Sequence, residues 1–277
     1  MRMPLLRTPG DAPLLVGHRG ACDVAPENTM PSFERALRDG ADIVEADVRL
    51  SADGEVMVVH DATVDRTTNG TGLVAAMTRA ELQALDAGSW FDASYRGAHI
   101  PTLTELATWA RGRIGLMLEF KFDPYGTFEP TLVPKTLAVV DAVGVRDQVV
   151  TISYQRRALA QLKDVAPDVP AGPLMPRNRR LAWALWWAER FPPLRAISWI
   201  GSALLSPLRY TVDAGCDIVA PNVDLASQLL VQAAHGLGMP VSCGGAAWDY
   251  PRAIRLGLDT ISANDPGLIF DCFFCET

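Results

Sequence analysis

The sequence predicts an α/β protein of the TIM, or (β/α)8, barrel class, and three observations support this prediction. Short β-rich runs alternate with helical patterns along nearly the whole chain. Several helical patterns end in glycine, the usual residue at a helix C-terminus. The 277 residues are enough for one barrel-sized domain with a large core. Alternating strands and helices imply a parallel sheet, and eight such units fit a barrel better than the alternative, an open doubly wound sheet.

The predicted strands are residues 13–17, 41–50, 114–120, 148–153, 169–175, 217–223, 239–245 and 259–264. The clearest helical patterns cover residues 30–40, 132–144, 155–166, 225–238 and 250–257. Two segments do not fit the repeat: a small Gly/Asn/Thr-rich insertion after the second strand, at about 54–100, and a Trp-rich insertion near 176–210. We therefore expect a single domain over residues 1–277 that carries these two insertions.

Composition and charge exclude several classes of protein. The net charge of -7 provides no basic surface for nucleic acid, so we expect no nucleic-acid partner. The apolar pieces of the N-terminus are interrupted by prolines and Asp11, unlike a signal peptide. No apolar run reaches the roughly 20 residues needed to span a bilayer. Five scattered cysteines do not suggest a disulfide framework, so we expect reduced thiols and a cytoplasmic location.

Three carboxylates stand in otherwise apolar strands. Glu45 and Asp47 are two residues apart, so their side chains share one face of the second strand. Glu119 ends the next strand in the run LMLEF. Burying such carboxylates without compensation costs several kcal/mol, and a bound cation would offset that cost. Oxygen ligands without cysteine suit Mg²⁺ or Ca²⁺ rather than zinc. The alternative is a structural ion network with Arg19, Arg49 and Lys121, and these residues alone leave both interpretations open.

Two histidines favour the catalytic interpretation. His18 and His60 each follow an apolar, strand-like run. A histidine exchanges its proton near neutrality, so the two are candidates for a general acid and a general base. Arg19 offers a planar fork for phosphate oxygens, and Lys121, two residues beyond Glu119 on the same face, adds a second positive charge. Metal, arginine and lysine together describe a site that holds a phosphate.

A series of short motifs then makes the sequence recognisable by its order and spacing. They are HRG at 18–20, PENT at 26–29, EADV at 45–48, HD at 60–61, DRTTNGTG at 65–72, IPTLTEL at 100–106 and EFK at 119–121. Together they resemble the glycerophosphodiester phosphodiesterase family. The resemblance is dense over residues 14–121 and extends to the closing run GLDTISANDPGLI near the C-terminus.

The resemblance implies a TIM barrel that hydrolyses a glycerophosphodiester to glycerol 3-phosphate and an alcohol with a divalent cation. It implies His18 and His60 as the acid/base pair, Glu45, Asp47 and Glu119 as metal ligands, and Arg19 and Lys121 as phosphate contacts. Glu27 and Asn28 are implied as supporting residues around the first histidine. The family mechanism also suggests that the glycerol 2-hydroxyl attacks first and forms a cyclic phosphate.

The chain departs from the family pattern near its C-terminus. The seventh strand reads SCGGAAW at 242–248 instead of a WTVN-like run, so Trp248 is the candidate for the aromatic wall of the substrate pocket. A purely structural role for Trp248 stays open. Asn264 stands where the family commonly has an aspartate, and Asp265 is a candidate to compensate for it.

The Trp-rich segment 181–208 has two interpretations. Trp183, Trp186 and Trp187 fall on one helical face behind several arginines, a pattern typical of peripheral contact with a membrane. The alternative is a hairpin that caps the barrel or contacts a second copy. Three functions follow: hydrolysis of small soluble glycerophosphodiesters, lysophospholipase D-type hydrolysis of membrane-derived lysophospholipids, or catalytically silent binding of lipid headgroups. A sphingomyelin hydrolase is disfavoured because PENT and EFK are retained.

Overall fold

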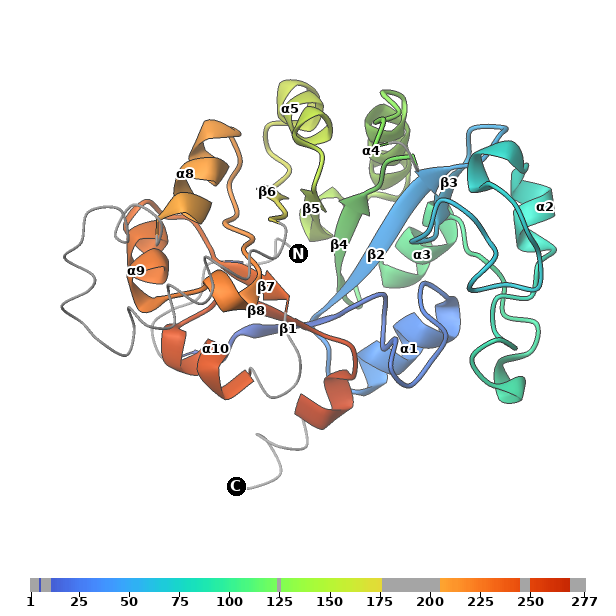
Figure 1. The fold of residues 1–277 in the computed structure, drawn as a ribbon, viewed down its shortest axis with the longest axis horizontal. Helices are drawn as coiled ribbons and strands as arrows, with labels where there is room; N and C mark the ends of the chain where they lie inside the picture. Colours follow the sequence, from blue (N-terminus) through green and yellow to red (C-terminus); the bar gives the residue numbers. More distant parts are fainter. Residues whose placement is uncertain (1–4, 6–10, 124–125, 176–204, 245–249, 270–277) are drawn as a thin grey trace.

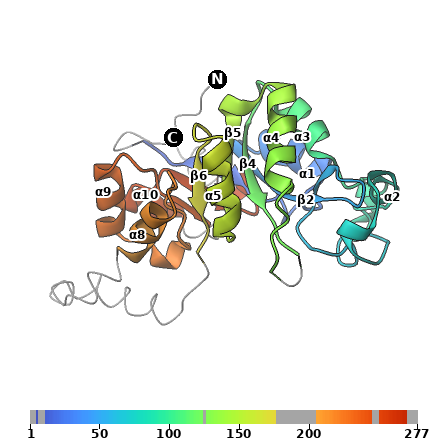
Figure 2. The ribbon, with the colours of Figure 1, turned by 90° about the horizontal axis from the view of Figure 1, so that it is seen from above.

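The computed structural model describes residues 5, 11–123, 126–175, 205–244 and 250–269, which form a mostly parallel, strongly curled sheet with helices around its outside (Figures 1 and 2). The sheet order is β6-β5-β4-β2-β1-β8-β7, with β3 paired antiparallel to β2. Its strands are β1 (Leu14–Gly17), β2 (Ile43–Leu50), β3 (Val56–Val58), β4 (Gly115–Phe120), β5 (Val149–Ser153), β6 (Ala171–Pro173), β7 (Ser242–Gly244) and β8 (Thr260–Ala263). This arrangement is the predicted TIM-barrel-like α/β fold.

The predicted strand at 217–223 differs from the prediction, because it is reduced to isolated bridge positions. Ala220 pairs with Leu174 beyond β6, while Val219 and Asn222 pair with residues in and next to β7. These bridges connect the two ends of the sheet and complete the ring. Regular pairing stops here because Pro221 has no amide N–H to donate to a neighbouring strand.

The outer helices follow the amphipathic patterns of the sequence. They are α1 (Met30–Arg38), α3 (Leu103–Ala110), α4 (Leu132–Val143), α5 (Arg156–Val165), α8 (Ser206–Asp213), α9 (Gln228–Gly236) and α10 (Tyr250–Leu256). The five predicted helices are confirmed as α1, α4, α5, α9 and α10. In α1, Pro31 lies in the first turn, where its missing N–H is not needed, and Phe33 and Ala36 are fully buried. Gly144 ends α4 in the left-handed conformation.

The segment between β2 and α3 is the small insertion that the sequence predicts, seen beside α1 and α3 in Figure 1. It contains β3, the 3-10 turn η1 (Val74–Ala76), α2 (Arg79–Gln83) and the turn η2 (Ala93–Tyr95). Met57, Val64 and Leu82 are among the buried residues of its own small core. Thr78 and Thr102 form capping boxes that fix the starts of α2 and α3. This packing holds the residues that follow β3 at the end of the sheet.

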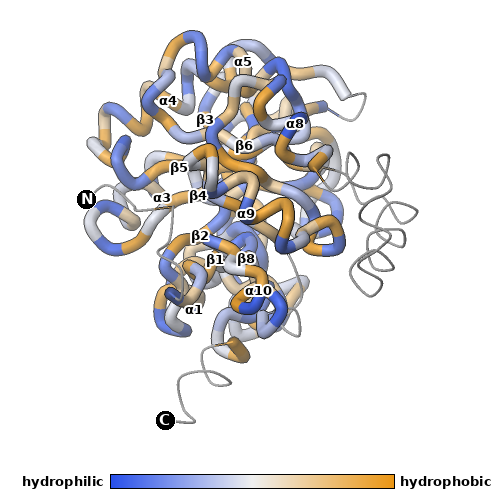
Figure 3. The backbone as a smooth tube through the Cα atoms, turned by 90° about the vertical axis from the view of Figure 1, so that its left-hand side faces the viewer, coloured by the Kyte–Doolittle hydropathy of each residue, from blue (hydrophilic) through white to orange (hydrophobic). Residues whose placement is uncertain are grey.

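Polar and apolar residues alternate along the outer helices, as expected for elements with one buried face (Figure 3). Among the described residues no helix combines the length and apolar character needed to cross a membrane. Most of the Trp-rich insertion, residues 176–204, lies outside the described residues, as do Trp183, Trp186 and Trp187. Its peripheral contact with a membrane therefore stays a prediction.

Candidate active site

The interior of the ring changes from apolar to charged along β2 and β4. Ile43 and Met117 pack inside the ring with other buried aliphatic residues. Two residues further along the same strands, and therefore on the same face, lie Glu45 and Glu119. Charged side chains thus gather at the carboxyl ends of the strands, the end at which TIM-barrel enzymes carry their chemistry.

The three predicted metal ligands lie together. Asp47 on β2 is paired in register with Glu119 on β4, and Glu45 shares the face of Asp47. All three are buried, and one oxygen from each lies within 4.8 Å of the others. Three carboxylate oxygens in this arrangement are the donor set that a hard divalent cation prefers.

The charges of these carboxylates are unequal. Burial, followed by repulsion from Asp47 and Glu119, raises the pKa of Glu45 well above its ordinary range. Burial also raises the pKa of Glu119. Burial opposes ionisation of Asp47 too, but the positive charges of Lys121, His60 and Arg19 outweigh it and lower the pKa of Asp47. Glu45 Oε1 is buried and has no hydrogen-bond partner among the described residues. This oxygen fits a ligand position for a cation.

The structural ion network is also present, but it is incomplete. Lys121 Nζ lies 2.8 Å from Asp47 Oδ1 and 2.6 Å from Glu119 Oε1. Among the described residues Glu45 accepts a hydrogen bond from the backbone N–H of Arg19, at 2.8 Å, and forms no direct ion pair with a cationic side chain. Arg49 does not pair with the carboxylates, because its guanidinium donates to the carbonyl oxygens of His60 and Phe122.

Arg19 occupies an unusual backbone conformation, with φ of 50° in the left-handed region. A non-glycine residue there costs on the order of 1 kcal/mol or more and needs support from its surroundings. That support comes from Asn28 N and Ser32 Oγ, which both donate to the Arg19 carbonyl oxygen. Arg19 Nη1 donates to Glu27 Oε1 at 2.9 Å, and Arg19 Nε lies 3.5 Å from Asp47 Oδ2. The Nε donor is buried and makes no hydrogen bond within the described part of the chain.

Asn28 holds the central carboxylate in place. Its φ is also positive, at 55°, and its Nδ2 donates to Asp47 Oδ2 at 2.7 Å. Asp47 N donates back to Asn28 Oδ1 at 3.2 Å. Thr29 occupies the N-cap position of α1, but its hydroxyl donates to the Pro26 carbonyl oxygen instead of capping the helix. The PENT motif therefore supports Asp47 as well as starting α1.

His18, directly after β1, is oriented by a neutral amide. Its Nδ1 lies 2.8 Å from Asn264 Oδ1, and Asn264 Nδ2 donates to Asp23 Oδ1 at 3.1 Å. Asp23 is an acceptor for the amide nitrogen, so this network is satisfied when Asn264 presents its oxygen to a hydrogen on His18 Nδ1. In that tautomer Nε2 is the ring nitrogen that accepts a proton. Burial and the charge of Arg19 lower the pKa of His18, although Asp47 opposes them. Asp265 does not replace Asn264; its carboxylate accepts from Gly267 N.

His60, after β3, is oriented by a carboxylate. Its Nδ1 lies 2.6 Å from Asp61 Oδ1, and Arg66 Nε donates to Asp61 Oδ2 at 2.6 Å. Arg66 also donates two hydrogen bonds to the carboxylate of Glu27, which in turn accepts from Arg19. Burial lowers the pKa of His60, while Asp47 and Asp61 oppose that shift. The pKa of Asp61 falls to about 2, because Arg66 and His60 outweigh its partial burial.

Asp61, Arg66 and Asn264 were not among the site residues predicted from the sequence. The adjacent HD and DRTTNGTG motifs carried the signal for the first two, but nothing in their spacing indicates that Arg66 reaches Glu27, 39 residues away. The predicted substrate residue Trp248 lies outside the described residues, so its role stays a prediction.

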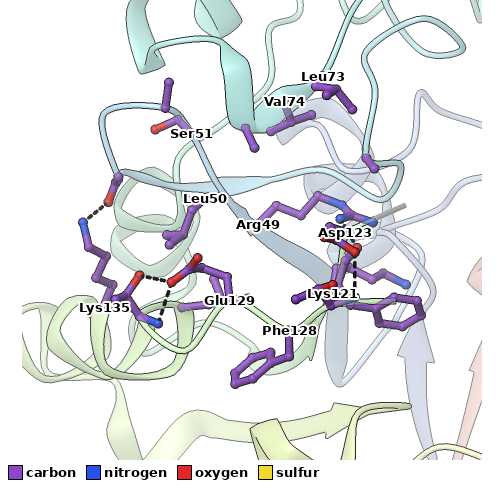
Figure 4. A pocket seen from close by; sticks show the side chains of 18 residues that line it. Arg49, Leu50, Ser51, Leu73, Val74, Lys121, Asp123, Phe128, Glu129 and Lys135 are labelled. Atoms are coloured by element: carbon purple, nitrogen blue, oxygen red, sulfur yellow. Dashed lines mark hydrogen bonds between the residues drawn. The ribbon is translucent and has the colours of Figure 1, made fainter. Parts of the chain in front are cut away.

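Two cavities adjoin these groups. One of about 480 Å³ is lined by His60, Asp61, Glu119, Lys121 and Tyr154, among others. The other, a groove of about 530 Å³, shares Arg49, Lys121 and Phe122 with the first, and Figure 4 shows the side chains that line it. Both volumes lie within the roughly 300–1,000 Å³ range of small-molecule sites.

Comparison with known proteins identifies relatives over most of the chain. The model of the "Glycerophosphoryl diester phosphodiesterase family" matches residues 18–267. A glycerophosphodiester phosphodiesterase of Caldanaerobacter subterraneus is 35% identical over 159 residues, 57% of this chain and 65% of that protein, so less than two thirds of its length is spanned. Another from Bacillus subtilis is 30% identical over 273 residues, 93% of this chain and 85% of the other. An Oleispira antarctica phosphodiesterase, solved with the product sn-glycerol-3-phosphate, has a TM-score of 0.74 and 27% identity, covering 93% of this chain and 95% of that one.

Proposed function

Because this chain belongs to the glycerophosphoryl diester phosphodiesterase family, we propose that it hydrolyses glycerophosphodiesters to glycerol 3-phosphate and an alcohol. The observation that carries the proposal is the meeting of three buried carboxylates with Arg19 and Lys121 at one end of the ring. Two histidines lie within electrostatic range of the same Asp47 and Lys121. A silent headgroup binder would not need both histidines held in fixed orientations.

Glu45, Asp47 and Glu119 are the proposed ligands of a divalent cation, Mg²⁺ or Ca²⁺. Glu45 Oε1 has no hydrogen-bond partner among the residues that the structure describes, and the pKa values of Glu45 and Glu119 are raised. Both observations support this assignment, since a cation would favour both ionised carboxylates. Such an ion, when bound, supplies positive charge to phosphate oxygens. Asn28 keeps Asp47 oriented whether or not the ion is present.

Arg19 and Lys121 are the proposed phosphate contacts. Arg19 Nε is a buried donor without a hydrogen bond in the described part of the chain, so it can donate to a phosphate oxygen without breaking one of those hydrogen bonds. Lys121 lies between Asp47 and Glu119, where its charge counters that of an incoming diester. Both groups remain available to stabilise the charge that increases on the phosphate oxygens during attack.

The histidines are the proposed acid and base. His18 Nε2 accepts the proton of the attacking hydroxyl as its oxygen bonds to phosphorus. His60 donates a proton to the oxygen of the leaving alcohol as the bond between that oxygen and phosphorus breaks. The partners support this division: the neutral Asn264 keeps His18 in the basic tautomer, while the Asp61 carboxylate favours the protonated form of His60. In the proposed first step the attacking group is the glycerol 2-hydroxyl, which forms a cyclic phosphate. Water then opens that cyclic phosphate in a second step.

The test is release of glycerol 3-phosphate from glycerophosphocholine by the purified full chain. We expect turnover that EDTA abolishes and that Mg²⁺ or Ca²⁺ restores. His18→Ala should lower kcat by about 10²- to 10⁴-fold. His99→Ala is the matched control, because His99 is partly exposed and contacts Glu105, outside this site. A folded, metal-supplied protein that binds the diester without turnover would establish the binding function instead. The cytoplasmic location is a further prediction.

A further inference from the structure

Arg49 stands near the carboxyl end of β2, two residues beyond Asp47 and on the same face of the strand. It is half-buried and lines both cavities at the reaction centre (Figure 4). In the described part of the chain, its guanidinium donates all of its hydrogen bonds to two backbone carbonyl oxygens, those of His60 and Phe122. An arginine that binds the protein's own backbone at such a place is a candidate for a role other than phosphate binding.

The fork of Arg49 joins two segments that carry groups of the proposed reaction. Nε and Nη2 both donate to the His60 carbonyl oxygen, at 2.9 and 2.8 Å, and Nη1 donates to the Phe122 carbonyl oxygen. His60 is the proposed acid, and Phe122 directly follows Lys121, a proposed phosphate contact. Because the guanidinium is planar and rigid, it fixes the two carbonyl oxygens relative to each other.

His60 lies where regular pairing with β2 has ended. β3 stops at Val58, and the last backbone link is the N–H of Val59, which donates to the Asp47 carbonyl oxygen at 2.9 Å. Asp61 orients the ring of His60, but as the adjacent residue it moves with the same segment. Among the described residues, the fork of Arg49 is therefore the hydrogen-bonded link between the His60 backbone and the strand of the metal ligands.

We propose that Arg49 is a positioning residue for the general acid. By holding the carbonyl oxygens of His60 and Phe122 on one rigid group, it sets the distance between the His60 ring and a phosphate bound at Lys121. This inference rests on the proposed function and adds a residue to its bond-breaking step, in which the proton of His60 passes to the oxygen of the leaving alcohol. Arg49 acts through the backbone and does not contact the substrate.

Two substrates with different leaving groups test this role in Arg49→Met. For glycerophosphocholine, whose leaving oxygen needs a proton, kcat/KM should fall about 10- to 100-fold, since a misplacement of about 1 Å can cost about 100-fold. For glycerophospho-p-nitrophenol, whose leaving oxygen needs no proton, kcat/KM should stay within about twofold of the native value. Equal losses with the two diesters would overturn the inference, because loss of a phosphate contact or of the fold affects both.

The effect of Arg49→Met should also depend on the ring that Arg49 positions. In a His60→Ala background, Arg49→Met should lower kcat/KM for glycerophosphocholine by less than about threefold, because the acid is already absent. If the two losses multiply in full, Arg49 does not act through His60, and the inference is overturned.

The matched control is Lys163→Met. Lys163 Nζ also donates to two backbone carbonyl oxygens, those of Pro167 and Val169, besides the carboxylate of Asp217. These contacts lie at the amino end of β6, away from the site, so the ratio of the two kcat/KM values should stay native.

Urea unfolding establishes that each variant is folded. If Arg49→Met does not fold, Arg49→Lys keeps the charge without the fork, and it should show a smaller loss that again appears only with glycerophosphocholine. Equal losses with both diesters in Arg49→Lys would overturn the inference and leave the proposed function intact. Absence of turnover of both diesters by the native chain, with Mg²⁺ or Ca²⁺ supplied, would overturn the proposed function itself.

Discussion

The two histidines of this site are held in different ways. His18 contacts a neutral amide, Asn264, which is fixed by Asp23. His60 contacts a carboxylate, Asp61, which is fixed by Arg66. A neutral amide oxygen stabilises the charged ring less than a carboxylate does, because it carries no full negative charge. The proposed mechanism uses this difference, with His18 as the base and His60 as the acid, although burial lowers the pKa of both rings.

The two sides also differ in how far their contacts extend. The contacts of His18 stay between the chain after β1 and the chain after β8. Those of His60 continue through Arg66 and Glu27 to Arg19, a proposed phosphate contact. A change on the His18 side should therefore act locally, and a change at Arg66 should affect both proton transfer and phosphate binding.

The largest expected effect comes from removing each ring and then changing the leaving group. His18→Ala and His60→Ala should each lower kcat by about 10²- to 10⁴-fold with glycerophosphocholine. A p-nitrophenol leaving group needs no proton, so the deficit of His60→Ala should nearly vanish with glycerophospho-p-nitrophenol. The deficit of His18→Ala should persist. Steady-state release of nitrophenolate measures both, and equal rescue of the two variants would refute the division of roles.

Arg66→Met tests the longer connection. Loss of charge-assisted hydrogen bonds to Asp61 and Glu27 should lower kcat/KM about 10- to 100-fold, since such bonds contribute about 1.5–3 kcal/mol. In an Asp61→Asn background the effect of Arg66→Met on kcat should shrink at least threefold, while its effect on KM, through Glu27 and Arg19, should remain. Arg79→Met is the control, because Arg79 lies in the same insertion and contacts Asp53 and Gln83. Full additivity of the two changes in kcat would exclude action through Asp61.

Asn264→Asp would give His18 the kind of partner that His60 has. In the native protein the pKa of His18 is lowered from its ordinary value of 6.5, so the ring stays neutral, and able to accept a proton, at a lower pH than a free histidine does. A carboxylate at this position favours the protonated ring, so the acid limb of the kcat/KM profile should move upward by about one pH unit. In the double variant Asn264→Asp with Asp23→Asn, the carboxylates at these two positions no longer repel each other. Its acid limb should also move upward. An unmoved acid limb would mean that another group controls it.

The sequence predicted the carboxylates better than their partners, for a physical reason. Strand alternation places Glu45 and Asp47 on one face of β2, and the parallel pairing of β2 with β4 brings Glu119 beside Asp47. The contact between Arg66 and Glu27 depends instead on how an insertion with its own core folds back over the ring. Similarly, an apolar run predicted a regular strand at 217–223, where a proline limits pairing to isolated bridges. Short-range periodicity determines faces, but not the paths of irregular segments.

The smallest expected effect is on stability, and it again separates the two sides. The pKa of Asp61 falls from its ordinary 3.8 to about 2 on folding, so its stabilising contribution is complete above pH 4 and is lost as the pH falls toward 2. Because Asp61 is partly exposed, solvent screening reduces this contribution to about 1 kcal/mol. Asp61→Asn should therefore destabilise the protein at pH 5 and approach the native stability near pH 2. Asn264→Ala should destabilise it equally at both, because a neutral amide does not titrate. Urea unfolding at the two pH values measures the difference, and a pH-independent cost for Asp61→Asn would mean that its carboxylate acts only through packing.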